Sequence, residues 1–226
     1  MGLYPVRVQI LMKTLLQTMA LATGLTLCLA QEPAQPLDGA VVEVVTGEAS
    51  ITTDGKALPI TKGQVLKEGH IIQTGKGGLL LLKLRNKGEL IVYENSRIEL
   101  KSEPKKPAKI RLLQTEGFTW TRMPKLRNDQ SFHVDMPAAT AGIRGTAFSA
   151  RVGRNKSSQV CVCEGAVTME TDEGEFTLKQ GELASAESGK PVERPTTDLK
   201  FLKHPTRETQ QCLKCHQGGY SRDGRY

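Results

Sequence analysis

The sequence predicts an all-β fold, and three observations carry that prediction. Short apolar runs alternate with turn signals such as Asp54-Gly55, Lys62-Gly63 and Asn86-Lys87-Gly88. The 226 residues include 22 Gly and 11 Pro, which favours many short strands over long helices. Only 4% of the residues are aromatic, so the core has to be built mainly from Val, Ile, Leu and Ala. Regular spacing of this kind is typical of a β-sandwich, a double-layered β-roll or a short β-solenoid.

The first 30 residues have the pattern of a cleavable signal peptide. Arg7 and Lys13 precede an uncharged, mostly apolar run that ends at Ala30 with the small residues that a signal peptidase recognises. We expect cleavage after Ala30 and an extracytoplasmic location for the rest. An uncleaved membrane anchor stays open as an alternative, although polar residues interrupt the run. Lipidation at Cys28 is a second alternative, but the residue before it, Leu27, is bulky where a lipidation signal has a small one.

The remaining chain is mildly basic. Without the two basic residues of the signal, 29 Lys and Arg stand against 24 Asp and Glu, a net charge of +5. Basic residues concentrate at 101–111 and 123–127, and we interpret them as solvated loop residues, with docking to an acidic partner or to anionic lipids as the alternative. We therefore expect membrane association only through an uncleaved signal or this basic surface. The sequence has no motif for nucleic-acid binding, and we expect none.

Residues 39–189 form the predicted β domain, after a short linker at 31–38. The stretch 140–152 joins its two halves. Beyond Gly145, the apolar residues Phe148, Ala150 and Val152 fall on one face of a strand. Ile143 precedes Phe148 by five residues, so a regular strand would place the two on opposite faces. A β-bulge at Gly145 would bring both inward, and we predict one there.

No catalytic constellation is visible in this domain. His70 and His133 are remote from any evident nucleophile, and we interpret each as a surface or partly buried histidine. Cys161 and Cys163 would point to the same side of one strand, with the valines beside them on the other side. We favour a packing role for the two thiols, while binding of a soft metal or electron exchange stays open.

Several runs in the domain resemble the FecR family. The closest likeness is Val134–Phe148, which is similar to the core signature of the FecR domain, an extracytoplasmic β module of bacterial signalling and envelope proteins. Similar runs occur at Gly63–Gly69, Glu94–Leu100 and Glu164–Val167. The resemblance implies a β-solenoid or a double-layered β-roll or sandwich. It also implies a place in the bacterial cell envelope, such as the periplasm, and a protein partner such as an envelope receptor or complex.

The composition changes after the β domain. Residues 190–205 have the prolines and polar residues of a linker, and residues 206–226 form a tail. The tail contains Cys212-Leu213-Lys214-Cys215-His216. Two thiols three residues apart with a histidine directly after the second is the spacing for covalent attachment of haem c. A short helix after Thr206 would place these side chains on one face.

This motif predicts one covalent haem c. Cys212 and Cys215 would form the two thioether links, and His216 would be the proximal iron ligand. His204 is the candidate for a distal ligand. A disulfide between the two cysteines, or a zinc site that uses His204 or His216, is the alternative.

Two functions follow from these patterns. The first is an exported FecR-type binding or scaffold module whose haem serves electron transfer with a redox partner, or redox or haem sensing. The alternative is an envelope signalling or interaction protein without haem, similar to the FecR sigma regulators, with a disulfide or zinc at the two tail cysteines. We expect no enzyme activity, although a small haem enzyme such as a peroxidase stays open, as does a homo-oligomer.

Overall fold

Strands account for most of the residues that the computed structural model describes. These residues are 39–84, 88–102, 109–128, 130–197, 209–210 and 212–213, and all of them belong to the unit Pro36–Tyr226. A second unit, Met1–Gln35, lies outside the described residues. Within the described ranges, no helix has the length and apolar character of a membrane span.

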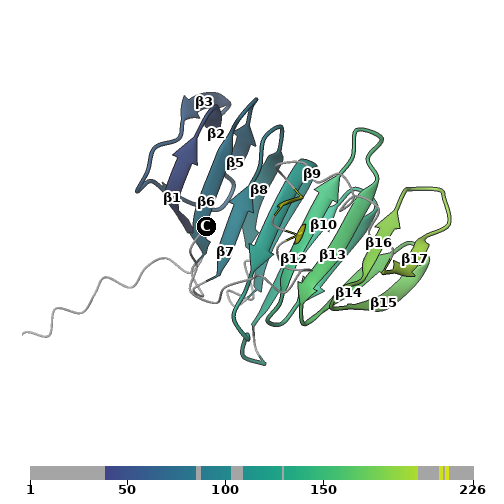
Figure 1. The fold of residues 1–226 in the computed structure, drawn as a ribbon. Helices are drawn as coiled ribbons and strands as arrows, with labels where there is room; N and C mark the ends of the chain where they lie inside the picture. Colours follow the sequence, from purple (N-terminus) through teal and green to yellow (C-terminus); the bar gives the residue numbers. More distant parts are fainter. Residues whose placement is uncertain are drawn as a thin grey trace, which may run out of the picture. The chain divides into compact units, whose positions relative to one another are not determined.

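The described part of the chain contains 17 strands (Figure 1). In the first half these are β1 (Ala40–Thr46), β2 (Ala49–Thr53), β3 (Lys56–Pro59), β4 (Val65–Leu66), β5 (Ile71–Thr74), β6 (Leu79–Leu84), β7 (Glu89–Val92), β8 (Arg97–Ser102) and β9 (Lys109–Arg122). In the second half they are β10 (Ser131–Met136), β11 (Ala139–Ile143), β12 (Ala147–Val152), β13 (Ser158–Glu164), β14 (Ala166–Thr171), β15 (Gly174–Lys179), β16 (Leu183–Ala186) and β17 (Glu193–Thr196).

The strand pairings form two ladders that share one long strand. Layer A has the order β4-β1-β6-β7-β9-β12-β13-β16-β17. Layer B has the order β3-β2-β5-β8-β9-β10-β11-β14-β15. The first part of β9 pairs within layer B and its last residues pair within layer A. These neighbours are antiparallel except for β9 and β10, which are parallel.

Two glycines mark places where the chain passes from one layer to the other. Gly117 lies inside β9 and has a φ of +84°, which a residue without Cβ adopts most readily. Gly145 connects β11 of layer B to β12 of layer A with a φ of +117°, and a Cβ there would lie 2.6 Å from the Lys125 Cα. Ile143 and Phe148 are both buried, as predicted. The predicted bulge at Gly145 is wrong, because this residue lies in a crossing between layers, and the irregular pairing of β12 occurs at Ala147 and Phe148.

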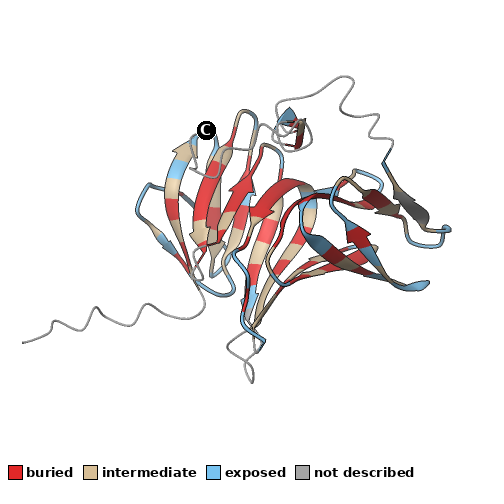
Figure 2. Ribbon diagram, turned by 60° about the horizontal axis from the view of Figure 1, so that its bottom comes forward, coloured by how far each residue is buried: buried red, intermediate tan, exposed pale blue. Residues whose placement is uncertain are grey.

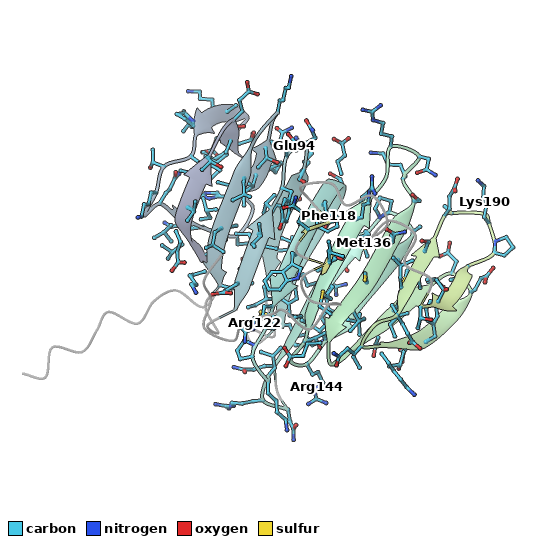
Figure 3. The ribbon with its side chains drawn as sticks, in the orientation of Figure 1. Glu94, Phe118, Arg122, Met136, Arg144 and Lys190 are labelled. Atoms are coloured by element: carbon cyan, nitrogen blue, oxygen red, sulfur yellow. The ribbon has the colours of Figure 1, made fainter. Side chains whose placement is uncertain are left out.

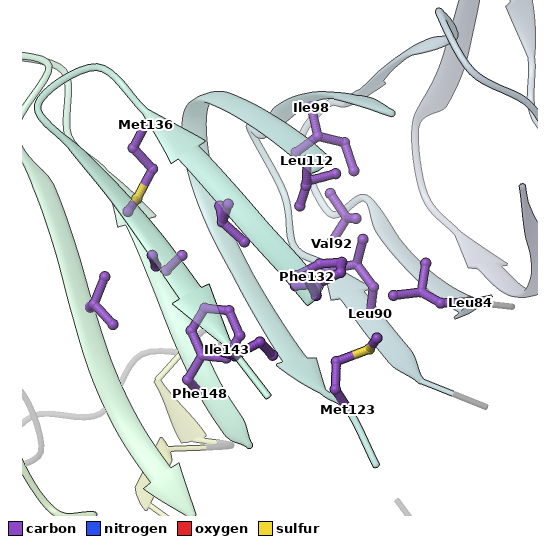
Figure 4. Close-up of a cluster of buried hydrophobic side chains, with 14 of the residues drawn as sticks. Leu84, Leu90, Val92, Ile98, Leu112, Met123, Phe132, Met136, Ile143 and Phe148 are labelled. Carbon is purple, nitrogen blue, oxygen red and sulfur yellow. The ribbon is translucent and has the colours of Figure 1, made fainter. Parts of the chain in front are cut away.

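The main core lies between the two layers. Inward side chains alternate along strands such as β10 and β11, and they come from both ladders (Figure 4). Figure 2 shows the buried residues as bands that run across neighbouring strands. Aliphatic residues and alanines make up most of this core, as predicted, and Phe132 and Phe148 are its largest aromatic members.

The all-β prediction is therefore confirmed, whereas a solenoid is not. Coils of a solenoid stack strands in parallel, but the described strands pair antiparallel with the single exception above. β17 falls within the predicted linker 190–205 and pairs with β16, so the strand pattern extends beyond Gly189. Of the predicted helical tail 206–226, only residues 209–210 and 212–213 are described, so the tail as a whole stays unconfirmed.

Candidate functional site

The outer face of layer A is apolar at its centre. Strands β12 and β13 each contain four consecutive buried residues, because side chains on both of their faces are covered. One face packs in the core between the layers. On the other face lies a second cluster, the outer cluster, whose members are Leu81, Ile91, Tyr93, Phe118, Trp120, Ala147, Cys163 and Cys212. The Tyr93 and Phe118 rings meet edge to face in this cluster, with centroids 5.3 Å apart.

The C-terminal residues supply part of this cover. Leu213 N–H donates to the Thr209 carbonyl oxygen at 2.9 Å, which closes one helical turn. Cys212, on the same turn, is fully buried in the outer cluster. Its thiol donates a hydrogen bond to Ser149 Oγ at 3.1 Å. Ser149 was not predicted as a site residue, although a hydroxyl between the apolar residues Phe148 and Ala150 is a signal for one.

Two further thiols lie on this side of layer A. Val160 and Val162 belong to the core between the layers, so Cys161 and Cys163 point the other way, as predicted. Both thiols are buried. Among the described residues, no three His, Cys, Asp or Glu side chains are grouped closely enough to hold a metal ion.

The outer face of layer B is polar. Arg111 Nε and Nη2 donate to the two carboxylate oxygens of Asp135 at 2.8 and 2.7 Å. The Thr140 hydroxyl adds a hydrogen bond of 3.1 Å to the same carboxylate. His133 Nε2 lies 3.1 Å from Ser131 Oγ. This network joins the parallel strands β9 and β10 to β11.

The charge on Arg111 controls the ionisation of Asp135. Burial of the carboxyl raises its pKa, but the hydrogen bonds and positive charge of Arg111, with smaller contributions from Thr140 and His133, outweigh burial and hold the pKa below its usual value. Asp135 therefore carries a full negative charge near neutral pH and is engaged in an ion pair. Half-buried His133 agrees with its interpretation as a partly buried histidine.

At the rim of the double layer, Arg144 points away from the sheet (Figure 3). Its Nη2 donates to the carbonyl oxygen and the side-chain oxygen of Asn128 at 3.3 and 3.0 Å. The Arg144 side chain thus serves a surface contact.

Of the residues predicted to hold haem, Cys212 lies within the described part of the chain, buried in the outer cluster beside the Ser149 hydroxyl. Its predicted thioether link stays a prediction. Cys215, His216 and His204 lie outside the described residues, so the roles assigned to them stay predictions.

Comparison with solved structures finds distant similarity. Two crystal structures of one protein from Parabacteroides distasonis, at 2.50 and 1.65 Å resolution, are described as a "putative anti-sigma factor". Each is 14% identical in sequence, with a TM-score of 0.49, over 56% of this chain and 58% of the solved chain. The chain thus spans little more than half the length of the protein it matches. No curated protein sequence matches it.

The comparison with protein families is more specific. The model of the family described as "FecR protein" matches residues 70–168, which include β5 to β13 and the first half of β14. This match overturns the first predicted function, a haem-carrying module for electron transfer or sensing, and favours the predicted alternative, FecR-type envelope signalling. The predicted resemblance to the FecR family is thus supported over residues 70–168, the part of the chain that the family model matches.

Proposed function

We propose that this chain is a FecR-type interaction module of the bacterial cell envelope, which binds a protein partner in signalling and catalyses no reaction. The family match over residues 70–168 is the observation that carries the proposal. The apparent signal peptide at residues 1–30 supports an extracytoplasmic, periplasmic location.

The polar groups of layer B support a binding module over an enzyme. Ser131, His133 and Asp135 alternate along β10, an order that in other settings suits nucleophilic catalysis. Here both carboxylate oxygens of Asp135 accept hydrogen bonds from Arg111, which neutralises the charge that would orient and stabilise a catalytic histidine. The network therefore favours a role in strand pairing.

We place the partner contact at the end of the double layer formed by β1, β3 and β4. Among the described residues, the large hydrophobic side chains that are exposed are Val44, Leu58 and Val65, and all three lie on these strands (Figure 1). β3 is the edge strand of layer B and is exposed along its whole length. Exposed apolar side chains beside a strand edge suit a partner that adds an extended segment. Lys56 and Pro59 on β3 would limit unspecific edge pairing.

The location is tested by fusing alkaline phosphatase to the C-terminus of the full chain. This reporter becomes active only where its disulfides form, outside the cytoplasm. We expect activity from the fusion and none when residues 1–30 are deleted. Equal activity with and without those residues would contradict the signal peptide.

The partner contact is tested by photo-crosslinking in intact cells. A photoreactive residue at Leu58 or Val65 should give one adduct of defined mass, whereas Glu175 and Lys179, on the opposite edge strand β15, should not. The protein in the adduct is then purified and titrated against the chain. Leu58→Lys should weaken binding at least tenfold, which corresponds to about 1.4 kcal/mol. Equal adducts from both ends, or unchanged affinity of the variant, would show that the contact lies elsewhere.

A further inference from the structure

Three cysteines from two distant parts of the chain come together on the outer face of layer A. Cys161 and Cys163 lie on β13, and Cys212 arrives from the C-terminal turn. Their exposed fractions are 2%, 5% and 0%. The predicted alternative for the tail pairs Cys212 with Cys215, but the structure directs the Cys212 thiol toward Ser149 of β12, the strand next to β13.

The register of layer A shows how close these thiols are. Ser149 on β12 lies directly opposite Cys161 on β13, and such pairs have Cβ atoms about 4.5–5.5 Å apart. Because Cys212 Sγ is 3.1 Å from Ser149 Oγ, it lies beside the residue that pairs with Cys161. Cys163, the next outward residue on β13, belongs to the same outer cluster as Cys212. A disulfide needs Cβ atoms about 3.5–4.5 Å apart, and the proposed link requires Cys212 and its partner on β13 to reach this spacing.

The two cysteines of β13 are poorly placed to bond to each other. Residues two apart on one strand are separated by roughly 6.6 Å along it, beyond the usual Cβ spacing of a disulfide. Cys212 is therefore the described cysteine best placed to pair with either of them.

We propose that Cys212 forms a disulfide with Cys161 or Cys163, which pins the C-terminal turn onto layer A. The link closes a loop of about 50 residues and holds the turn over Trp120 and its neighbours. Its formation in cells rests on the extracytoplasmic location proposed above, because thiols there meet oxidising conditions.

The reaction is thiol–disulfide exchange with a small or protein disulfide as oxidant. One cysteine thiolate attacks the oxidant, which forms a mixed disulfide and releases the first reduced thiol. The second cysteine thiolate then displaces the second reduced thiol and forms the internal S–S bond. Two protein thiols lose two electrons to the oxidant, and their two protons end on the two released thiols. The three cysteines are buried when the C-terminal turn packs on layer A, so thiol–disulfide exchange begins while the turn is dissociated from layer A.

The test is peptide mapping of the purified full chain after equilibration with oxidised glutathione. Remaining thiols are alkylated and the protein is digested with trypsin without reduction. Cleavage places Cys161 and Cys163 in peptide 157–179, Cys212 in peptide 208–214 and Cys215 in peptide 215–222. We expect a linked species of 157–179 with 208–214 that disappears on reduction. The same species should appear in protein taken directly from the exported fraction of cells.

Variants assign the bond. Cys212→Ala, and Cys161→Ala with Cys163→Ala together, should each abolish the linked species, while Cys215→Ala, the matched control, should retain it. A link between 208–214 and 215–222, or alkylated cysteines in all three peptides, would overturn the proposal. Because the glutathione experiment uses purified protein, its result does not depend on location or partner, so failure of this proposal and failure of the proposed function are separate outcomes.

Discussion

The two-layer architecture depends on the bend at Gly117, so Gly117→Ala gives a direct test of it. At this residue β9 leaves layer B and enters layer A with a φ of +84°. Ser96 packs against the bend: the Phe118 N–H donates to Ser96 Oγ at 3.0 Å, and the Ser96 hydroxyl lies 3.2 Å from the Phe118 carbonyl oxygen. A Cβ at residue 117 would lie 2.5 Å from the Ser96 Cα, which is backbone and therefore hard to move.

Three costs add up in this variant. Holding an alanine in the left-handed region costs about 1–2 kcal/mol. Forcing an extra carbon against buried Ser96 costs about 1–3 kcal/mol. Displacing Ser96 from its hydrogen bond with Phe118 costs about 1 kcal/mol more. We therefore expect Gly117→Ala to lower the free energy of unfolding by about 3–6 kcal/mol, a large part of the stability of an ordinary domain.

Gly181→Ala is the matched control. Gly181 has almost the same φ, +86°, but a Cβ there would have no atom within 4 Å. Only the backbone cost should remain, about 1–2 kcal/mol. Urea denaturation of both variants, followed by circular dichroism, gives the two values. Equal losses would refute the argument, because they would mean that the contact with Ser96 contributes nothing.

Three further changes test other parts of the structure. Phe132→Ala should lower the free energy of unfolding by about 3–5 kcal/mol, because Phe132 is buried between the layers. Leu58→Ala, on the surface, should change it by less than about 0.5 kcal/mol. Similar values for the two variants would contradict the assignment of Phe132 to the core. Asp135→Asn should be less stable than the wild type at neutral pH. The folded pKa of Asp135 is lowered, so the stabilisation from its charge is present above the ordinary pKa of 3.8 and is lost as the pH falls through the folded pKa. If the difference in unfolding free energy between the wild type and Asp135→Asn stayed constant in acid, the Arg111 ion pair would not be its source. Deleting residues 198–226 should uncover the outer cluster, including Trp120, and increase binding of a hydrophobic dye, and unchanged dye fluorescence would show that the C-terminal turn does not cover it.

Local alternation was enough to predict which side chains face the core. Phe148, Ala150 and Val152 are buried between the layers, and Cys161 and Cys163 face the opposite side from the valines beside them. Successive side chains of a strand point to opposite faces, so the face of each residue can be predicted without knowing which strands pair with it. For the same reason the all-β class was accessible from the sequence.

The pairing of strands distant in sequence was not accessible in this way. A change of phase at Gly145 has the same appearance whether the chain bulges within one ladder or crosses to another, and the structure shows the crossing. Likewise, nothing local indicates that β9 belongs to both layers. That arrangement depends on contacts between residues far apart in the chain.

For the tail motif, the spacing of Cys212 and Cys215 could not predict what surrounds the thiols. The contact of Cys212 with Ser149 depends on the tertiary structure. A signal for that contact was nevertheless present. Runs that are apolar on both faces, such as Val160–Cys163, indicate that both faces of the strand are covered, and the second cover on layer A includes the C-terminal turn.

The proposed partner contact and the proposed disulfide lie on different parts of the domain, which makes them separable. Leu58 belongs to the edge strand of layer B, before the residues matched by the FecR family model, whereas Cys161 and Cys163 lie near the other end of layer A. The strand orders place β3 and β13 in different ladders with no direct pairing between them. Substitutions distant from each other with no shared contacts are expected to act independently. Leu58→Lys should therefore weaken partner binding without changing the fraction of linked peptide, and Cys212→Ala should remove the link without changing partner affinity. If Cys212→Ala changed that affinity tenfold, the C-terminal turn would have to be part of the partner surface, and the assignment of binding to the β1, β3 and β4 end would be wrong.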